Sequence, residues 1–510
     1  MTPFRFCLQI FLGLAIIIAT ASAFVPQVFA QSLQGTLADE RVAASMGLDV
    51  EWILQLPFDS TQWRLQHVVI GDGLVVAQST DGGVHAIKTL TSSAPMTPKS
   101  SAKKPDQPSS IDIQPQPSPS RIADMPPGAL LWSHRIGHPG GPVHPAGIGS
   151  NVVTVSRDLD VFALERITGQ TRWHDRIHRS PVHGATPSGQ WVYVPLSSDS
   201  VIRLAADPKA QSAASSIESS GKEKSSTAKK KKSPKQTSKK KESATGAIGE
   251  SVLPIELAAG GRVETQPNAF FDGVLWCTRT GTLVCLEPID AGWDRHEILL
   301  RSPIAGRPFV RDAMCVVATV GGDLVRVDLL TTKGSGFRIQ WFHPMGAIPV
   351  DGVFVVDDRV IVPLELGELA AFSVSTGLPL WRCGGVESVL CINDERIWFV
   401  DQTGKLASLD PVSGERRESL KLGPFQFLIR NDQTDRLYMA THNGVLASLH
   451  ASGKKTGVNY ATASAGESAK GTAKTKSGSP DTSQDAPSES PPDDSAVAPD
   501  EASRDTFESP

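Results

Sequence analysis

Eight pairs of apolar residues, with the two members of each pair nine positions apart, constrain the fold of this chain more than any other feature. Turn-forming residues lie between the members, for example Asp81-Gly82-Gly83 in the first pair and Asn443-Gly444 in the last. Two short apolar runs around such a turn predict a β-hairpin. The pairs are Val75/Val84, Val152/Val161, Val192/Val201, Val274/Leu283, Cys315/Leu324, Val360/Leu369, Ile397/Leu406 and Leu437/Leu446. Eight hairpins in one chain indicate a repeat protein.

The spacing of the hairpins indicates the kind of repeat. The second members of successive pairs are about 40 residues apart, except for two steps of 77 and 82 residues. Two low-complexity inserts, residues 91–127 and 206–250, account for the excess. A period near 40 residues with four short strands is typical of a β-propeller blade, and residues 48–450 without the inserts supply about 320 residues, enough for eight blades. We therefore predict an all-β, eight-bladed β-propeller over residues 48–450.

The two ends of this region predict how the ring closes. The last repeat, residues 423–450, has three predicted strands and no fourth, whereas residues 50–56 read as a fourth strand that precedes the first hairpin, with Trp52 in the usual tryptophan position. An open ring would leave exposed strand edges. We therefore predict that the N-terminal strand completes the last blade.

The inserts and the C-terminal tail have compositions that cannot form a core. Both inserts follow the third strand of a repeat, so we expect them on one face of the ring, and residues 451–510 form an acidic tail rich in Ser and Pro. We predict disorder in all three segments. Lysine runs at 229–232 and 239–241 have no interleaved aromatic residues for base stacking, and the net charge is −4. These features favour a solvated linker and no nucleic acid partner.

Residues 1–30 resemble a secretory signal peptide. Arg5 precedes an apolar stretch from Leu8 to Ala19, and small-residue cleavage sites end at Ala23 and Ala30. The signal predicts an extracytoplasmic protein, periplasmic or secreted. An uncleaved segment that anchors the protein in the inner membrane, and so associates it with a membrane, is the alternative.

The tryptophan and glycine positions carry a family resemblance. The repeat with Thr168-Gly169 and Trp173, and the repeat with Thr376-Gly377 and Trp381, resemble the quinoprotein-dehydrogenase-like repeat. In this motif the tryptophan fills the space between blades and the glycine forms a turn. The chain is thus similar to pyrroloquinoline-quinone-like (PQQ-like) β-propeller proteins. That family includes quinone-dependent alcohol dehydrogenases and a non-enzymatic lipoprotein of the outer-membrane β-barrel assembly machinery, which this chain resembles in fold.

The resemblance does not extend to the catalytic features of the family's enzymes. Those enzymes carry two adjacent cysteines beside the quinone and a calcium site, and no two cysteines of this chain are adjacent. We therefore expect no enzymatic activity, no cofactor and no catalytic or metal-binding residues. The sequence leaves open whether Cys383 and Cys391 pair.

Histidines form the one candidate site. His138, His144, His178 and His183 fall in two similar connections between blades, each containing Pro-Val-His, at 142–144 and 181–183. The predicted topology places them near one mouth of the central channel, where imidazoles could bind a metal or an anion. The alternative is that two repeats inherited one turn, since no carboxylate or cysteine ligand motif accompanies them.

These features predict a secreted, non-enzymatic propeller that serves as a binding or scaffold module for an envelope macromolecule, either a protein or an envelope polymer. Two alternatives remain. The first is an assembly factor for outer-membrane proteins, and the second is a quinone- or metal-dependent oxidoreductase.

Limited digestion tests the prediction of a disordered second insert. We expect trypsin to cleave first within residues 222–241, because exposed polar segments are the preferred sites of proteolysis. The nicked chain should keep its cooperative thermal transition, since the strands predicted at about 200–205 and 252–257 pair within one blade. Loss of that transition on cleavage would contradict the prediction.

Overall fold

A computed structural model describes residues 36–89, 125–207, 254–289, 292–330, 336–393 and 395–460. The predicted signal peptide at residues 1–30 lies outside the described residues. So do residues 91–124 and 208–250 of the two inserts and the tail beyond residue 460. The predictions for those segments therefore stay predictions.

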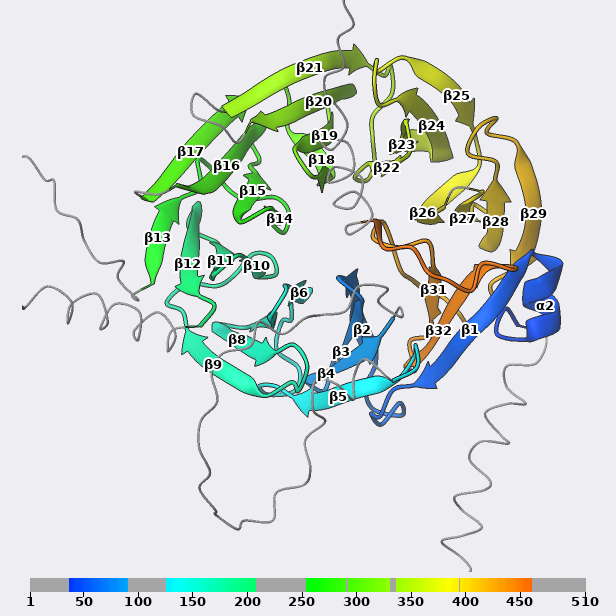
Figure 1. Cartoon of the computed structure of the whole chain (residues 1–510), viewed down its shortest axis with the longest axis horizontal. Coiled ribbons are helices and arrows are strands. Elements are labelled where there is room, and N and C mark those ends of the chain that lie inside the picture. The colour runs from blue at the N-terminus through cyan, green and yellow to red at the C-terminus, as the bar shows by residue number, and fades with distance from the viewer. Residues whose placement is uncertain are drawn as a thin grey trace, which may run out of the picture. The chain divides into compact units, whose positions relative to one another are not determined.

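The described chain forms eight four-stranded antiparallel sheets that surround a central channel, as Figure 1 shows. In each sheet, or blade, the first strand lines the channel and the fourth lies at the rim. This architecture confirms the prediction of an all-β, eight-bladed propeller. The ring consists of repeats of one motif, so each blade must pack against both of its neighbours to bury its two faces.

Blade 1 consists of β2 (Leu65–Gly71), β3 (Leu74–Ser79), β4 (Gly83–Lys88) and β5 (Leu130–Arg135), and blade 2 of β6 (Gly147–Ile148), β7 (Val152–Arg157), β8 (Asp160–Glu165) and β9 (Thr171–Arg176). Blade 3 consists of β10 (Thr186–Ser188), β11 (Trp191–Leu196), β12 (Ser200–Ala205) and β13 (Ile255–Ala258), and blade 4 of β14 (Asn268–Phe270), β15 (Gly273–Cys277), β16 (Thr282–Ile289) and β17 (Gly292–Leu299).

Blade 5 consists of β18 (Ile304–Arg311), β19 (Met314–Thr319), β20 (Asp323–Leu330) and β21 (Gly336–Pro344), and blade 6 of β22 (Phe354–Val356), β23 (Arg359–Leu364), β24 (Glu368–Ser373) and β25 (Pro379–Cys383). Blade 7 consists of β26 (Val386–Ile392), β27 (Ile397–Asp401), β28 (Lys405–Leu409) and β29 (Arg416–Lys421), and blade 8 of β30 (Phe427–Leu428), β31 (Leu437–Ala440), β32 (Val445–Ala451) and β1 (Leu48–Gln55).

The eight apolar pairs lie on the second and third strands of the eight blades. In blade 6, for example, Val360 pairs with Phe372 and Ile361 with Ala371 across β23 and β24. These two strands are sandwiched between neighbouring blades, so both of their faces are buried. Strands β3 and β4 of blade 1 are buried along their whole length. The core is therefore a series of apolar layers between adjacent blades.

Tryptophans of the outer strands dock on the next blade. The indole Nε1 of Trp341 in blade 5 donates a hydrogen bond of 2.8 Å to the carbonyl of Val374 in blade 6. Gly377 lies so close that a Cβ atom there would be 2.7 Å from the Trp341 ring. The same contact joins Trp132 to Arg166 and Gly169, and Trp381 to Pro411 and Gly414. This contact explains why tryptophan and glycine recur at these positions of the repeat.

The N-terminal strand closes the ring as predicted. Strand β1 pairs with β32 from Leu48 opposite Ala451 to Gln55 opposite Val445. Trp52 lies within this strand, is 8% exposed and packs against Tyr438, with ring centroids 6.1 Å apart. The last blade is thus built from strands near both ends of the described chain.

A buried ion pair reinforces this closure. The side chain of Arg436 in blade 8 is fully buried, and its Nε lies 3.2 Å from a carboxylate oxygen of Glu51 in β1. Asp435 accepts from Nη1 of Arg436 at 2.9 Å, and Ser448 donates to Glu51. Removing Glu51 would leave a buried guanidinium with one carboxylate instead of two, which is strongly destabilising in general.

Two short segments outside the predicted boundaries also contact the propeller. The helix α2 (Glu40–Ser45), capped by the Asp39 side chain, precedes β1 and buries Ala43. Residues 451–460, which the sequence assigned to the tail, pack beside blades 7 and 8, where the Tyr460 hydroxyl donates to the carbonyl of Ile392 at 3.2 Å. Across the described ranges, no helix is long and apolar enough to span a membrane.

Two glycines allow the tryptophan contact to be tested separately from backbone strain. Gly377 and Gly404 both have positive φ angles, +75° and +73°, but only Gly377 faces a tryptophan; a Cβ at Gly404 would meet no atom within 4 Å. We expect Gly404→Ala to cost about 1 kcal/mol of unfolding free energy, from the left-handed backbone alone. Gly377→Ala should cost about 2 to 4 kcal/mol, because the methyl group also forces Trp341 to move.

Chemical unfolding of the two variants and the unmodified protein measures this difference. Equal losses for Gly377→Ala and Gly404→Ala would show that the tryptophan contact contributes little.

Candidate functional site

The antiparallel blades give the propeller two distinct faces. Connections from first to second and from third to fourth strands lie on one face, and the remaining connections lie on the other. Both inserts interrupt third-to-fourth connections, after β4 and after β12, which confirms their predicted place in the repeats. We call this side the insert face. The opposite side carries His144 and His183 in fourth-to-first connections, and we call it the histidine face.

Three histidines bridge successive blades on the histidine face. The Nε2 atom of His67, in blade 1, lies 3.0 Å from the carbonyl oxygen of Val143 in blade 2. The ring of His144 interacts in a similar way with the backbone of Pro181 in blade 3. The ring of His183 interacts with the backbone of Val263 in blade 4. Each imidazole thus ties one blade to the next.

The same three side chains lie close enough to affect one another. Burial lowers the pKa of His67, His144 and His183 below the usual histidine value. After burial, the largest influences on His144 are the neighbouring His183 and His67, each of which lowers its pKa further. The pKa of His183 is held up in part by Glu264. The three rings are therefore held in the neutral state at pH 7.

The structure brings together only two of the four histidines predicted to form a site. His144 and His183 are neighbours, whereas His138 and His178 are exposed, and His178 lies 3.3 Å from a carboxylate oxygen of Glu256. His67 was missed, because it lies within the inner strand β2, whereas His144 and His183 lie in the connections before β6 and β10. No metal-binding group of three or more His, Cys, Asp or Glu side chains occurs in the part of the chain that the structure describes. Ion binding at His144 and His183 stays a prediction.

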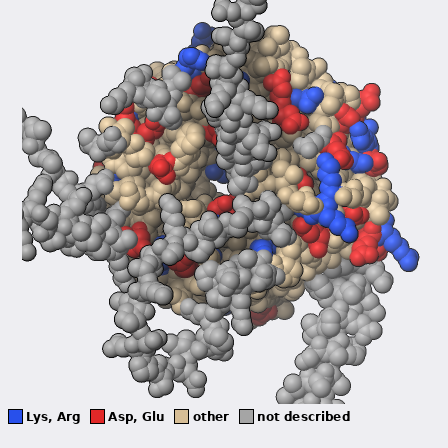
Figure 2. Space-filling model, viewed as in Figure 1, with Lys and Arg blue, Asp and Glu red and all other residues tan. Residues whose placement is uncertain are grey.

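Charged side chains also line the channel. Figure 2 shows a narrow opening at the centre of the ring with charged atoms near its edge. Arg430, from the segment between β30 and β31, lies 2.8 Å from a carboxylate oxygen of Asp351 in blade 6. Asp432 acts electrostatically on Arg307 and Arg311 of blade 5. The channel region thus combines imidazoles on the histidine face of blades 1 to 3 with arginines from blades 5 and 8.

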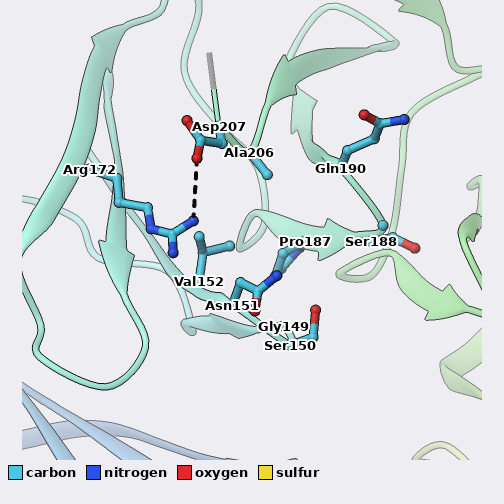
Figure 3. Close-up of a pocket in the computed structure, with 11 residues that line it drawn as sticks. Gly149, Ser150, Asn151, Val152, Arg172, Pro187, Ser188, Gln190, Ala206 and Asp207 are labelled. Carbon is cyan, nitrogen blue, oxygen red and sulfur yellow. Dashed lines mark ion pairs between the residues drawn. The ribbon is translucent and has the colours of Figure 1, made fainter. Parts of the chain in front are cut away.

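A small pocket of about 230 Å³ lies between blades 2 and 3 on the insert face (Figure 3). The charged residues of its lining form a pair, with Arg172 3.9 Å from Asp207, and Arg172 also pairs with Glu165 outside the lining. Because two carboxylates already neutralise this guanidinium, the pocket has no charge left to select an anion. Its walls are formed by Gly149, Ser150, Asn151, Val152, Arg172, Pro187, Ser188, Gly189, Gln190, Ala206 and Asp207.

Four exposed apolar side chains gather on the histidine face of blades 5 and 6. Leu366 is 89% exposed, Val350 60%, Val320 47% and Ile348 43%. We call these four residues the blade 5–6 surface. Solvent-exposed leucines and valines that cluster on one face are typical of interaction sites.

The loops that carry the blade 5–6 surface are held by backbone hydrogen bonds. The amide of Glu365 donates to the carbonyl of Ile348 at 2.8 Å, and the amide of Val350 donates to Pro363 at 3.1 Å. Gln402 of blade 7 donates to the carbonyl of Leu366, which has φ 60° and ψ 16°. This left-handed conformation is unfavourable for leucine by about 1 to 2 kcal/mol. The surrounding loops therefore hold an exposed apolar residue in a strained position.

The five cysteines of the described chain are all free thiols, so Cys383 and Cys391 form no disulfide. Cys277, Cys285, Cys315 and Cys391 are buried in the layers between blades. Burial raises the pKa of Cys277 to about 11 and raises the pKa values of the other three buried thiols as well. Neutral buried thiols act as small apolar side chains, not as nucleophiles.

The ring and its repeated Trp and Gly contact define an eight-bladed β-propeller. Residues 121–211 match the sequence model of a family described as outer membrane protein assembly factor BamB. The structure of BamB from Moraxella catarrhalis has 16% sequence identity to this chain, with a TM-score of 0.50; the match covers 80% of this chain and 98% of that one. The predicted resemblance in repeat and fold is thereby confirmed.

A second solved structure is similar in outline. The computationally designed Ika8 protein has 11% sequence identity and a TM-score of 0.48, and the match covers 78% of this chain and 98% of that chain. No curated protein sequence matches the chain significantly. At 16% identity, the match to the BamB structure shows a common fold.

The buried histidines predict a pH-dependent stability. An unfolded histidine has a pKa of about 6.5. Because the pKa values of His67, His144 and His183 are lower in the folded state, the unfolded chain binds more protons at acidic pH. The unfolding free energy should therefore be highest above pH 6.5 and fall as the pH drops below it. His144→Gln should reduce this slope by up to about 1.4 kcal/mol per pH unit.

Urea unfolding between pH 7.5 and 5 measures the slope. The exposed His138 provides the matched control, since His138→Gln should leave the slope unchanged. Identical slopes for His144→Gln and the unmodified protein would contradict the assignment.

Proposed function

We propose that this protein is an extracytoplasmic, non-enzymatic scaffold that binds another envelope protein through the histidine face of blades 5 and 6. The observation that carries the proposal is the blade 5–6 surface, with Leu366 held exposed in a left-handed conformation. A loop backbone that is already held in one conformation loses little conformational entropy on binding, so burial of its side chain contributes more to affinity.

The surroundings of the surface favour a protein partner over a membrane. Glu365 is exposed beside Leu366, and Arg382 lies 3.3 Å from Glu368 on the same blade. Apolar side chains surrounded by charged ones are the usual composition of a protein interface, with an apolar centre and a polar rim. A carboxylate next to the most exposed leucine would disfavour contact with anionic lipid head groups.

An assembly factor for outer-membrane proteins is the more specific form of this proposal. It is supported by the match of residues 121–211 to the BamB family model and by the similarity in fold to BamB. Under this form, the envelope partner is a component of the machinery that inserts β-barrel proteins. The predicted signal at residues 1–30 is consistent with the same compartment.

Charge substitutions on the blade 5–6 surface test the proposal. We expect Val350→Asp/Leu366→Asp to lower recovery of the bound partner by about tenfold or more, since buried carboxylates would replace two apolar contacts. A photo-reactive amino acid at position 366 of the full-length protein, used in the native envelope, identifies the partner by mass spectrometry. Once the partner is known, the amount of it that co-purifies with each variant, without the photo-reactive residue, measures binding.

The chain offers a matched control on the insert face. Leu378 and Val412 are 59% and 64% exposed and lie in third-to-fourth turns. Leu378→Asp/Val412→Asp introduces the same charge and should leave recovery unchanged. A crosslinked barrel-assembly component would support the more specific form, and any other envelope protein would support the general one. No crosslinked protein, or equal losses in both double variants, would refute the proposal.

A further inference from the structure

An irregular segment of blade 8 enters the central channel. After β30, residues 429–436 run beside the inner strand of blade 7, where Asn431 pairs with Cys391 in a parallel bridge. The buried Asn431 side chain donates to the carbonyls of Thr434 and Arg436, which fixes the shape of the segment. The residues on either side of Asn431 are therefore held in defined positions. These residues are Arg430 and Asp432.

Arg430 is fully engaged by blade 6. Its guanidinium pairs with Asp351 at 2.8 Å, donates to the carbonyl of Val353 at 2.7 Å, and stacks 3.8 Å above the ring of Phe354. A guanidinium with a carboxylate, a carbonyl and an aromatic face has little capacity for a further ligand. Arg430 therefore has a structural role and links blade 8 to blade 6.

Arg307 of blade 5 differs from Arg430 in having a free guanidinium end. Its Nε donates to the side-chain oxygen of Asn268 in blade 4 at 2.5 Å, and Asn268 is itself 5% exposed. Among the described residues, no hydrogen bond or ion pair involves the Nη1 or Nη2 atom of Arg307, and the side chain is exposed. The Asn268 contact thus orients the guanidinium and leaves its two terminal nitrogens available.

The charges around Arg307 leave it only partly neutralised. Asp432 attracts Arg307, but it also interacts with Arg430 and Arg311. Asp351 neutralises Arg430, and Asp312 and Asp357 also attract Arg311. Asp432 is the carboxylate that attracts Arg307, and Arg307 shares it with Arg430 and Arg311. A carboxylate beside Arg307 would add to the attraction that Asp432 supplies and offset the repulsion from Arg430.

We propose that Arg307, oriented by Asn268, is a binding site for a carboxylate group that enters the central channel. The two Nη atoms match the two oxygens of a carboxylate, which is the bidentate geometry that arginine favours. The carboxylate belongs either to a small free acid or to an acidic side chain of a peptide. This site is independent of the blade 5–6 surface and does not rest on the proposed scaffold function.

Titration calorimetry of the full-length protein tests the site with three probes: glutarate monomethyl ester, a capped tetraglutamate peptide and inorganic phosphate. We expect at least one carboxylate probe to bind, and Arg307→Gln to weaken that binding at least about tenfold. Arg307→Lys keeps the charge but loses the paired donors, so it should weaken binding to a smaller extent. Arg338, which is 63% exposed and outside the channel, supplies the charge-matched control Arg338→Gln.

Each outcome has a defined meaning. Binding of the ester assigns the site to small acids, and binding of the peptide alone assigns it to acidic protein segments. Either result supports the site, provided that Arg338→Gln binds the same probe as tightly as the unmodified protein does and that all variants melt at similar temperatures. No binding of either carboxylate at millimolar concentration, tighter binding of phosphate, or unchanged binding by Arg307→Gln would overturn it.

Discussion

The docking of outer-strand tryptophans on the next blade is the interaction on which the ring depends. Blades that radiate from a channel diverge toward the rim, so the outer strands need the largest side chains to remain in contact. Trp132, Trp341 and Trp381 provide these contacts, and each indole N–H also donates to a turn carbonyl. Because the contact joins a strand to a turn of the next blade, it fixes the angle between blades as well as their distance.

The inserts are tolerated because they interrupt the turn and leave the strands paired. At the second insert, Trp173 still donates to the carbonyl of Ala206, the first residue of the predicted insert, which packs in the apolar layer between blades 2 and 3. At the first, Gly128 lies against the ring of Trp52, although the indole Nε1 of Trp52 has no hydrogen-bond partner in the described chain. Loop length affects stability only weakly once the flanking strands pair. Ring closure between β1 and β32, with Arg436 buried against Glu51, then joins residues 385 positions apart.

The two faces of the ring carry different features. The inserts begin and end on the insert face, whereas His67, His144, His183 and the blade 5–6 surface lie on the histidine face. Imidazoles of blades 1 to 3 contact the next blade there, and Arg430 joins blades 8 and 6, which are not adjacent. A partner on the histidine face and a carboxylate in the channel would therefore contact the same rigid ring at two separate places.

The sequence by itself determined the number of blades, the closing strand near Trp52 and the position of both inserts, because hairpins and turns depend on residues within a few positions of one another. It also located His144 and His183 through a repeated local motif. Only the tertiary structure decided that His67 joins them while His138 and His178 do not. Likewise, Arg307, Asn268 and Asp432 meet because the ring closes, and distances between side chains on different blades follow from the packing of all eight, which no local pattern encodes.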